Sequence, residues 1–170
     1  MCGITGILNL KEPNLISVDV IAKMAGYLRH RGPNESGIYI DDWTGIAQTR
    51  LSIIDLAGGT QPIHNEDKTL WIVFNGEIYN YIELKSDLIK SGHKFYTNTD
   101  TEIILHLYEE KQENCLHMLN GQFAFSIWDS IIRNYLLPGI ELVKNHYTIL
   151  FVKTNLFSLP KLKQFLLIKT

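Results

Sequence analysis

Cysteine is scarce in this chain, and so is any excess of charge of one sign. Two cysteines among 170 residues, Cys2 and Cys115, are too few for a framework of disulfides. The formal net charge is -2 with both signs interspersed, which leaves no basic stripe for nucleic acid and no polybasic tract for a membrane surface. We therefore expect small-molecule or protein partners, and neither nucleic acid nor a membrane.

Long hydrophobic runs are also missing. No apolar run reaches the roughly 20 residues that span a bilayer. The beginning of the chain has no cationic segment followed by an apolar one. The sequence therefore predicts a cytoplasmic protein. With 45% hydrophobic and 20% charged residues, its length fits one globular domain with a sizeable core.

The expected strands and helices interleave in an order that does not repeat. The residue patterns predict strands at 2–10, 36–40, 45–50, 51–55, 70–75 and 122–130, and helices at 17–28, 78–93, 98–110 and 115–121. This order favours a layered α+β domain over a repeat array or a parallel barrel.

Helix faces and caps follow from the same patterns. The helix after Ser17 should turn five side chains inward: Val20, Ile21, Met24, Ala25 and Leu28. The helix at 78–93 should bury four apolar side chains: Ile78, Ile82, Leu88 and Ile89. Thr99 and Glu102 have the spacing of a capping box, which would begin the next helix.

The chain opens with MCGITG, which places a cysteine directly behind the initiator methionine. A thiol is mostly protonated at neutral pH, so a catalytic cysteine needs a base beside it. If Met1 is removed, Cys2 carries its own base, because an α-amino group has a pKa of about 7.7–8.0. The motif alone is weak, since a cysteine near the end of a chain is more often accidental than catalytic.

Six ordered blocks give the chain a resemblance to a known family. They are MCGITG, RHRGPNESG, RLSIIDLAGGTQP, NEDKTLWIVFNGEIYN, TDTEIILHLYEE and LNGQFAFSIWD. In order and spacing they resemble the class II glutamine amidotransferase domain of glutamine-hydrolysing asparagine synthetases, over residues 1–137. The resemblance implies an N-terminal-nucleophile hydrolase with a four-layer αββα sandwich, incomplete at its C-terminal end. In such a hydrolase the cysteine attacks the side-chain amide of glutamine, releases ammonia and leaves a glutamyl thioester that water hydrolyses.

The resemblance also implies roles for residues near the middle of the chain. Arg50 matches the arginine that binds the substrate α-carboxylate, a task that suits the guanidinium fork. Without the surrounding block, a solvated arginine at a strand end would be the simpler interpretation. The residues that follow would line the same pocket through backbone groups, while also serving as core strand residues: Leu51, Ser52, Ile53 and Ile54.

FNGE supplies the next part of the expected site. The Asn75 side chain and the Gly76 N–H match the oxyanion hole of the family, although Asn-Gly by itself is a common hairpin signal. Glu77 and Asp100 resemble the groups that receive the substrate α-ammonium. Asp100 can also complement the dipole of a helix as its first-turn carboxylate.

Other polar residues carry no chemistry in this interpretation. The loop with Arg29, His30 and Arg31 lies over the glutamine site in the family, so we expect it to gate the site or support it structurally. The remaining histidines lack ligand spacing, so no metal is expected. Cys115 is expected in the core. No cofactor is expected for this chain, because ATP and Mg²⁺ belong to a synthetase domain that it lacks.

The resemblance stops near Leu137. The family continues in a pattern like ARDRxGxKPLYY and later FASEIKA, which this chain does not show. If the third base of each codon is read with the first two of the next, however, Pro138 to Ile149 can encode the first pattern and Phe157 to Gln164 the second. We infer a single-base deletion near the Leu137 codon. Residues 138–170 would then be a frameshifted, non-native tail.

Three functions follow from this sequence. The first is a glutaminase domain that takes glutamine as substrate and supplies ammonia for asparagine synthesis, with a separate synthetase domain or a second copy as partner. The second is a catalytically dead remnant of such a gene. The third is an amidotransferase half that serves another acceptor. The intact site favours the first, and the altered tail favours the second.

Overall fold

Two β-sheets lie face to face in the computed structural model, which describes residues 2–9, 12–51, 58–137 and 149–154. The first sheet has the strand order β2 (Glu35–Ile40), β3 (Thr44–Arg50), β1 (Gly3–Asn9) and β8 (Ile149–Thr154). The second has the order β4 (Ile63–His64), β5 (Leu70–Ile78), β6 (Gly121–Asp129) and β7 (Asn134–Leu136). All neighbouring strands are antiparallel except β1 and β8, which are parallel. The expected α+β class is confirmed.

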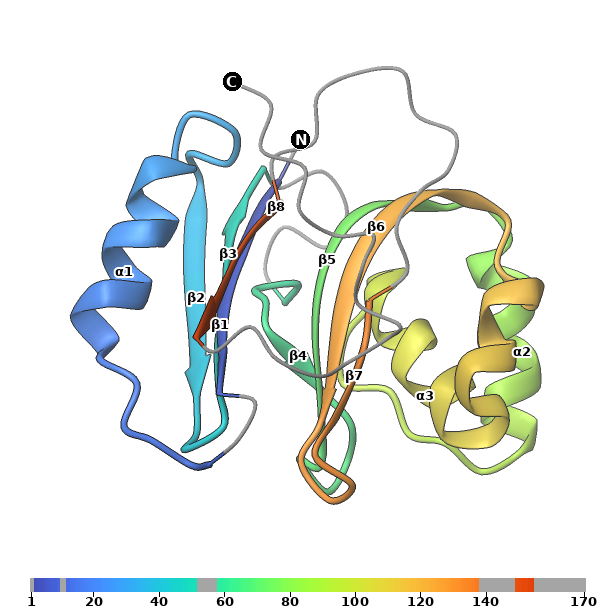
Figure 1. Ribbon diagram of the computed structural model, residues 1–170. Helices are drawn as coiled ribbons and strands as arrows, with labels where there is room; N and C mark the ends of the chain where they lie inside the picture. Colours follow the sequence, from blue (N-terminus) through green and yellow to red (C-terminus); the bar gives the residue numbers. More distant parts are fainter. Residues whose placement is uncertain (1, 10–11, 52–57, 138–148, 155–170) are drawn as a thin grey trace.

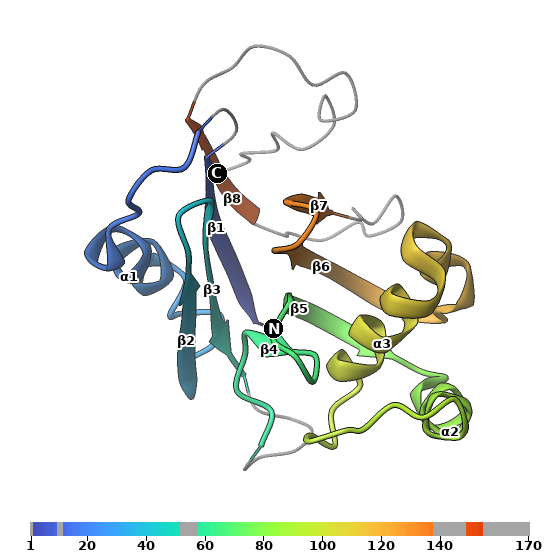
Figure 2. The same cartoon turned by 90° about the horizontal axis from the view of Figure 1, so that it is seen from below.

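Helices cover the outer sides of the two sheets. Helix α1 (Val18–Tyr27) lies against the first sheet, and α3 (Thr101–Lys111) lies against the second with α2 (Tyr81–Lys90) beside it (Figure 1). The view from below shows α1 and the α2–α3 pair on opposite sides of the molecule (Figure 2). Ile4, Ile46 and Val73 form a small core between the sheets, and the largest core lies between the second sheet and α3. The sequence pattern is responsible, because β1, β3, β5 and β6 bury apolar side chains.

Close approach of the backbone sets the position of the first strand. A Cβ atom on Gly3 would lie 2.6 Å from Leu28 Cβ and 2.6 Å from Thr49 Oγ1. Only glycine therefore lets the start of β1 pack under the end of α1 and beside β3. Gly3 pairs with Thr49 in this ladder, so Cys2 is held near Arg50, where β3 ends.

Several local expectations are wrong. In α1, Ile21, Met24, Ala25 and Leu28 are buried as expected, but Val20 is 46% exposed. In α2, Leu84 and Leu88 face the core, whereas Ile82 and Ile89 are 64% and 54% exposed. Ile78 is buried, but it belongs to β5. The helix begins three residues later than its expected start, and its inward face is formed by Leu84 and Leu88, which lie one turn apart.

The expected capping box does not form at α3. Asp100 is the N-cap residue, and the carboxylate of Glu102 instead accepts hydrogen bonds from the backbone N–H groups of Tyr96 and Thr97, at 2.9 and 2.7 Å. Glu102 therefore holds the segment that enters the helix. The short helix expected at 115–121 is a 3-10 helix, η1 (Gln112–Met118), in which Cys115 is buried as expected. The strand expected at 51–55 lies largely outside the described residues.

Candidate active site

Cys2 lies where the two sheets meet. Its backbone nitrogen donates a 2.9 Å hydrogen bond to Asn75 Oδ1 on β5. The Leu51 N–H points at the Cys2 thiol with a nitrogen–sulfur distance of 3.4 Å, and Arg31 Nε donates to the Cys2 carbonyl at 3.2 Å. The nitrogen, the sulfur and the carbonyl of Cys2 are thus each held by a different segment of the chain.

A cavity of about 240 Å³ opens beside the thiol. Seven residues that were singled out from the sequence line it: Cys2, Arg50, Leu51, Asn75, Gly76, Glu77 and Asp100. The structure therefore brings the expected site residues together from β1, β3, β5 and the start of α3. Ser52, Ile53 and Ile54 lie outside the described residues.

Arg50 is a buried cation in the wall of this cavity. Only 4% of the residue is exposed, and its Nη1 lies 3.0 Å from Glu35 Oε2. Thr60 Oγ1 donates to the same carboxylate oxygen at 2.7 Å. The hydrogen bonds from Thr60 and Arg50 lower the pKa of Glu35. The ion pair with Glu35 thus fixes the position of the guanidinium in the cavity wall.

Asn75 and Gly76 lie inside β5 and not in a hairpin turn. They pair with Ala124 and Phe123 on β6, so the turn that Asn-Gly often marks does not occur here. A Cβ on Gly76 would lie 2.3 Å from the Gln122 carbonyl oxygen. Glycine is thus required for the close pairing of β5 and β6. Because Asn75 Oδ1 accepts from Cys2, the amide nitrogen of Asn75 is the part that can donate to a ligand.

A buried carboxylate faces the cavity from the start of α3. Asp100 is 5% exposed, and its Oδ2 accepts a 2.9 Å hydrogen bond from the Ile78 N–H. Burial raises the pKa of Asp100, the Ile78 N–H opposes this shift, and the nearby charge of Glu77 adds to it. A cationic group bound here would replace the lost hydration of the carboxylate.

Sequence reasoning missed several residues of the cavity wall: Gly59, Gln61, Phe74, Tyr79, Thr99, Thr101 and Gln122. Gln61 is the most constrained of them. Its Oε1 accepts from the Phe74 N–H at 2.6 Å, and its Nε2 donates to Thr101 Oγ1 at 3.3 Å. Gln61 therefore connects β5 to α3 across the cavity floor. Its position beside Pro62 in a loop gives no local pattern that would have identified it.

These features define a class of protein: a two-sheet α+β fold in which a cysteine, a buried arginine and a buried carboxylate surround one cavity. The chain belongs to the glutamine amidotransferase domain family, whose profile matches residues 1–138.

Among the residues that the structure describes, no helix is both long enough and apolar enough to cross a membrane.

Curated relatives support the same family. Asparagine synthetase [glutamine-hydrolyzing] 1 of Bacillus subtilis (strain 168) is 45% identical over 132 residues, which are 76% of this chain and 21% of that protein. The probable asparagine synthetase [glutamine-hydrolyzing] of Dictyostelium discoideum is 43% identical over 138 residues, 80% of this chain and 25% of that protein. The chain thus spans about a fifth to a quarter of the length of these relatives.

A solved structure with the same fold is glutamine phosphoribosylpyrophosphate (PRPP) amidotransferase from B. subtilis. It aligns with a TM-score of 0.55 at 22% identity and covers 76% of this chain and 35% of that one. This likeness concerns the fold alone.

Proposed function

We propose that this chain hydrolyses the side-chain amide of glutamine, with Cys2 as the nucleophile once Met1 has been removed. The observation that carries the proposal is the 2.9 Å hydrogen bond from the Cys2 nitrogen to Asn75 Oδ1, at the edge of a cavity lined by Arg50 and Asp100. That nitrogen becomes the α-amine of the processed chain. The proposed nucleophile (the Cys2 thiol), its base (the Cys2 nitrogen) and a hydrogen-bond donor (the Asn75 amide) would thus lie within one site.

In the proposed first step the α-amine of Cys2 takes the thiol proton, and the thiolate attacks the carboxamide carbon of glutamine. The amide nitrogen of Asn75 and the N–H of Gly76 stabilise the oxyanion that forms; one such donor contributes about 3–4 kcal/mol. The proton on the amine passes to the leaving nitrogen as the C–N bond breaks, and ammonia departs. The product is a glutamyl thioester on Cys2.

In the second step the free amine takes a proton from water, which attacks the thioester. The C–S bond breaks, glutamate leaves, and the proton returns to the sulfur. The reaction consumes glutamine and water and needs no cofactor.

Glutamine is selected by the two ends of its amino-acid group. Arg50 would pair with the α-carboxylate, and Asp100, with Glu77 nearby, would receive the α-ammonium. Leu51 and the following residues 52–54 would border the substrate through backbone groups. A simple amide lacks both charges, so it would bind weakly.

The proposal also includes a detailed fold type and the molecule that accepts the ammonia. The arrangement of α1, two sheets, α3 and α2 fits a four-layer αββα sandwich of the N-terminal-nucleophile type. The 40–45% identities to asparagine synthetases support asparagine synthesis as the use of the ammonia in a longer relative. The phosphoribosylpyrophosphate enzyme is more distant at 22%, so an acceptor of that kind is the weaker alternative.

The frameshift interpretation of residues 138–170 remains part of the proposal. The family match ends at residue 138, which agrees with the point where the family pattern stops. Sequencing the DNA around the Leu137 codon tests it. An offset frame that encodes the family pattern supports the interpretation, and an offset frame that lacks the pattern or stops early refutes it.

Ammonia release from glutamine tests the proposed activity. The full chain is expressed, removal of Met1 is confirmed by intact mass, and turnover is compared with that of Cys2→Ala. We expect turnover in the processed wild type and none in the variant. A folded, processed wild type without turnover would favour the dead remnant, and activity that survives in Cys2→Ala would refute Cys2 as nucleophile.

A further inference from the structure

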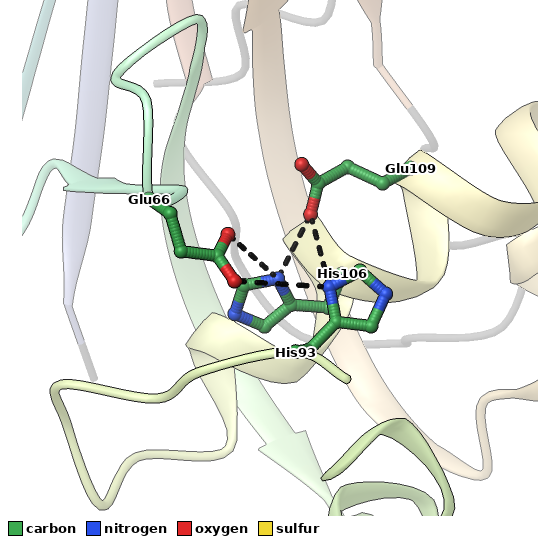
Figure 3. A group of neighbouring side chains, drawn as sticks. All are labelled: Glu66, His93, His106 and Glu109. Carbon is green, nitrogen blue, oxygen red and sulfur yellow. Dashed lines mark hydrogen bonds and ion pairs between the residues drawn. The ribbon is translucent and has the colours of Figure 1, made fainter. Parts of the chain in front are cut away.

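Two histidines and two glutamates gather on the far side of the second sheet from the first. Glu66 comes from the connection between β4 and β5, His93 follows α2, and His106 and Glu109 lie on α3. One potential ligand atom from each lies within 4.8 Å of all the others. Figure 3 shows the four side chains turned toward one another. We call these four residues the His–Glu cluster.

The distances inside the cluster, from 2.8 Å to at most 4.8 Å, lie on both sides of the spacing in a tetrahedral site. His106 Nδ1 lies 2.8 Å from Glu109 Oε2 and 3.6 Å from Glu66 Oε2. His93 Nδ1 lies 3.6 Å from the same Glu109 oxygen and 3.9 Å from Glu66 Oε1. Metal bonds of about 2.0–2.2 Å in tetrahedral geometry place ligand atoms roughly 3.3–3.6 Å apart. Small side-chain rotations would therefore bring all four atoms to bonding distance.

Each histidine presents Nδ1 to the centre of the cluster and Nε2 to an outer carboxylate. Nε2 of His106 lies 3.7 Å from Glu102 Oε1, and Nε2 of His93 lies 3.4 Å from Glu110 Oε1. Histidines that bind metals characteristically have their other nitrogen facing a carboxylate or carbonyl, which fixes the ring and its tautomer. A carboxylate thus lies near the outer nitrogen of each ring, although Nε2 of His106 makes no hydrogen bond at this distance.

The glutamates are oriented as well. Asn65 Nδ2 donates to Glu109 Oε1 at 2.8 Å, which leaves Oε2 for the centre of the cluster. The Lys94 N–H donates to Glu66 Oε1 at 2.9 Å. His106 is fully buried, whereas the Glu66 side chain is 40% exposed and provides a route of entry from solvent.

We propose that the His–Glu cluster binds a single Zn²⁺ ion as a structural site. Two imidazole and two carboxylate ligands suit zinc, whereas Mg²⁺ and Ca²⁺ prefer all-oxygen sites. The ion would join the β4–β5 connection, the segment after α2, and α3. Because Asp100 and Thr101 lie at the start of α3 and line the cavity, the ion would also stabilise that wall of the proposed glutamine site.

The simpler alternative is an ion-pair network without metal. In that case the 2.8 Å hydrogen bond between His106 Nδ1 and Glu109 Oε2 would be a main contact within the cluster. A zinc ion would instead bind both Nδ1 atoms and both carboxylates, and the two arrangements differ in whether the protein retains zinc.

Metal binding to the full chain tests the proposal. Protein stripped with chelator is incubated with Zn²⁺ and dialysed, and zinc is measured by elemental analysis. We expect one equivalent per chain and a rise in Tm of about 5–10 °C at a hundredfold excess over Kd. With Co²⁺ as the probe, we expect tetrahedral visible bands and no thiolate charge-transfer band. Such a band would assign the metal to Cys2 or Cys115 and refute the cluster.

Variants locate the metal. Glu66→Gln and His93→Gln change two ligands that are partly exposed, one glutamate and one histidine, and each should weaken zinc binding at least about tenfold. His117→Gln and Glu83→Gln change exposed residues outside the cluster and should bind zinc as the wild type does. Wild-type protein that retains no zinc and shows no Tm shift would overturn the proposal. Undiminished binding in the Glu66 and His93 variants would overturn it equally.

Discussion

Arg50 and Glu35 form an ion pair at the wall of the cavity, with Nη1 and Oε2 separated by 3.0 Å. The arginine side chain is 5% exposed and the glutamate side chain 33% exposed. The Glu35 carboxylate therefore binds one nitrogen of the guanidinium group and lies on its more solvent-exposed side. A substrate carboxylate would have to share the guanidinium with Glu35 or displace it.

Arg50→Lys should raise KM for glutamine by roughly 10–100-fold, because a charged hydrogen bond contributes about 1.5–3 kcal/mol and lysine cannot pair bidentately. Steady-state ammonia release measures this effect. An amide substrate without the α-carboxylate provides the control, since its turnover should be the same in both proteins. Equal losses for both substrates would show that Arg50 supports the fold of the site and does not select the carboxylate.

Gly59→Ala should disturb the same arginine. A Cβ at this position would lie 2.4 Å from Arg50 Nη2 and 2.7 Å from Thr99 Cγ2. We expect a loss of about 1–3 kcal/mol in the free energy of unfolding and a higher KM for glutamine. Gly26→Ala is the matched control, because its Cβ would meet nothing within 4 Å inside α1. That substitution should stabilise the protein by about 0.5–1 kcal/mol, as chemical denaturation would show. Equal stability of both variants would contradict this packing.

Affinity for glutamine should weaken in mild acid because the pKa of Asp100 is raised by burial. The α-ammonium of glutamine binds the ionised carboxylate, so binding is complete above this pKa and is lost as pH falls through it. We expect KM to rise as the pH is lowered through the range in which Asp100 gains its proton, which lies above that of an ordinary aspartate. Asp100→Asn should have a high KM at pH 7 and lose most of this dependence. A KM for the wild type that is constant over the range would contradict the role of Asp100.

Stability of the metal-free protein should fall on the alkaline side. Burial lowers the pKa of His106, but hydrogen bonds to Glu102 and Glu109 and the charge of Glu66 more than offset this and raise it to about 9. A raised pKa contributes stability that is complete below the unfolded value near 6.5 and is lost as pH rises through about 9. Urea denaturation in chelator should show a loss on the order of 1–3 kcal/mol over this window. The His93 ring packs beside the His106 ring, so His93→Gln is measured in parallel. A wild-type free energy of unfolding that does not change with pH over this window would contradict the raised pKa of His106.

The sheets were predictable, because strand patterns depend on alternation along short segments. The paired strands over 36–40 and 45–50 and the longer strand that begins at Leu70 are found near their expected positions. The expected inward face of α2 combined Ile78, which belongs to β5, with residues of the helix. Leu84 and Leu88, one turn apart, form the face that packs on the core, and Ile82 and Ile89 are exposed.

The site itself depended on the family resemblance, since each residue taken alone has a common structural explanation. Asn75 and Gly76 would have been assigned to a turn, and Arg50 to a solvated strand end. Glu102 shows a local pattern that misled. The capping box with Thr99 does not form, because the Glu102 carboxylate accepts hydrogen bonds from the Tyr96 and Thr97 N–H groups instead. The His–Glu cluster could not be predicted, because its members come from three segments that only the fold brings together.

The most direct test of the central claim is mass spectrometry of the processed protein quenched in acid during turnover of glutamine. The account predicts a glutamyl group on the peptide that begins with Cys2, no such group on the Cys115 peptide, and no adduct in Cys2→Ala. Ammonia release with the adduct on another residue, or an adduct that persists in Cys2→Ala, would contradict it.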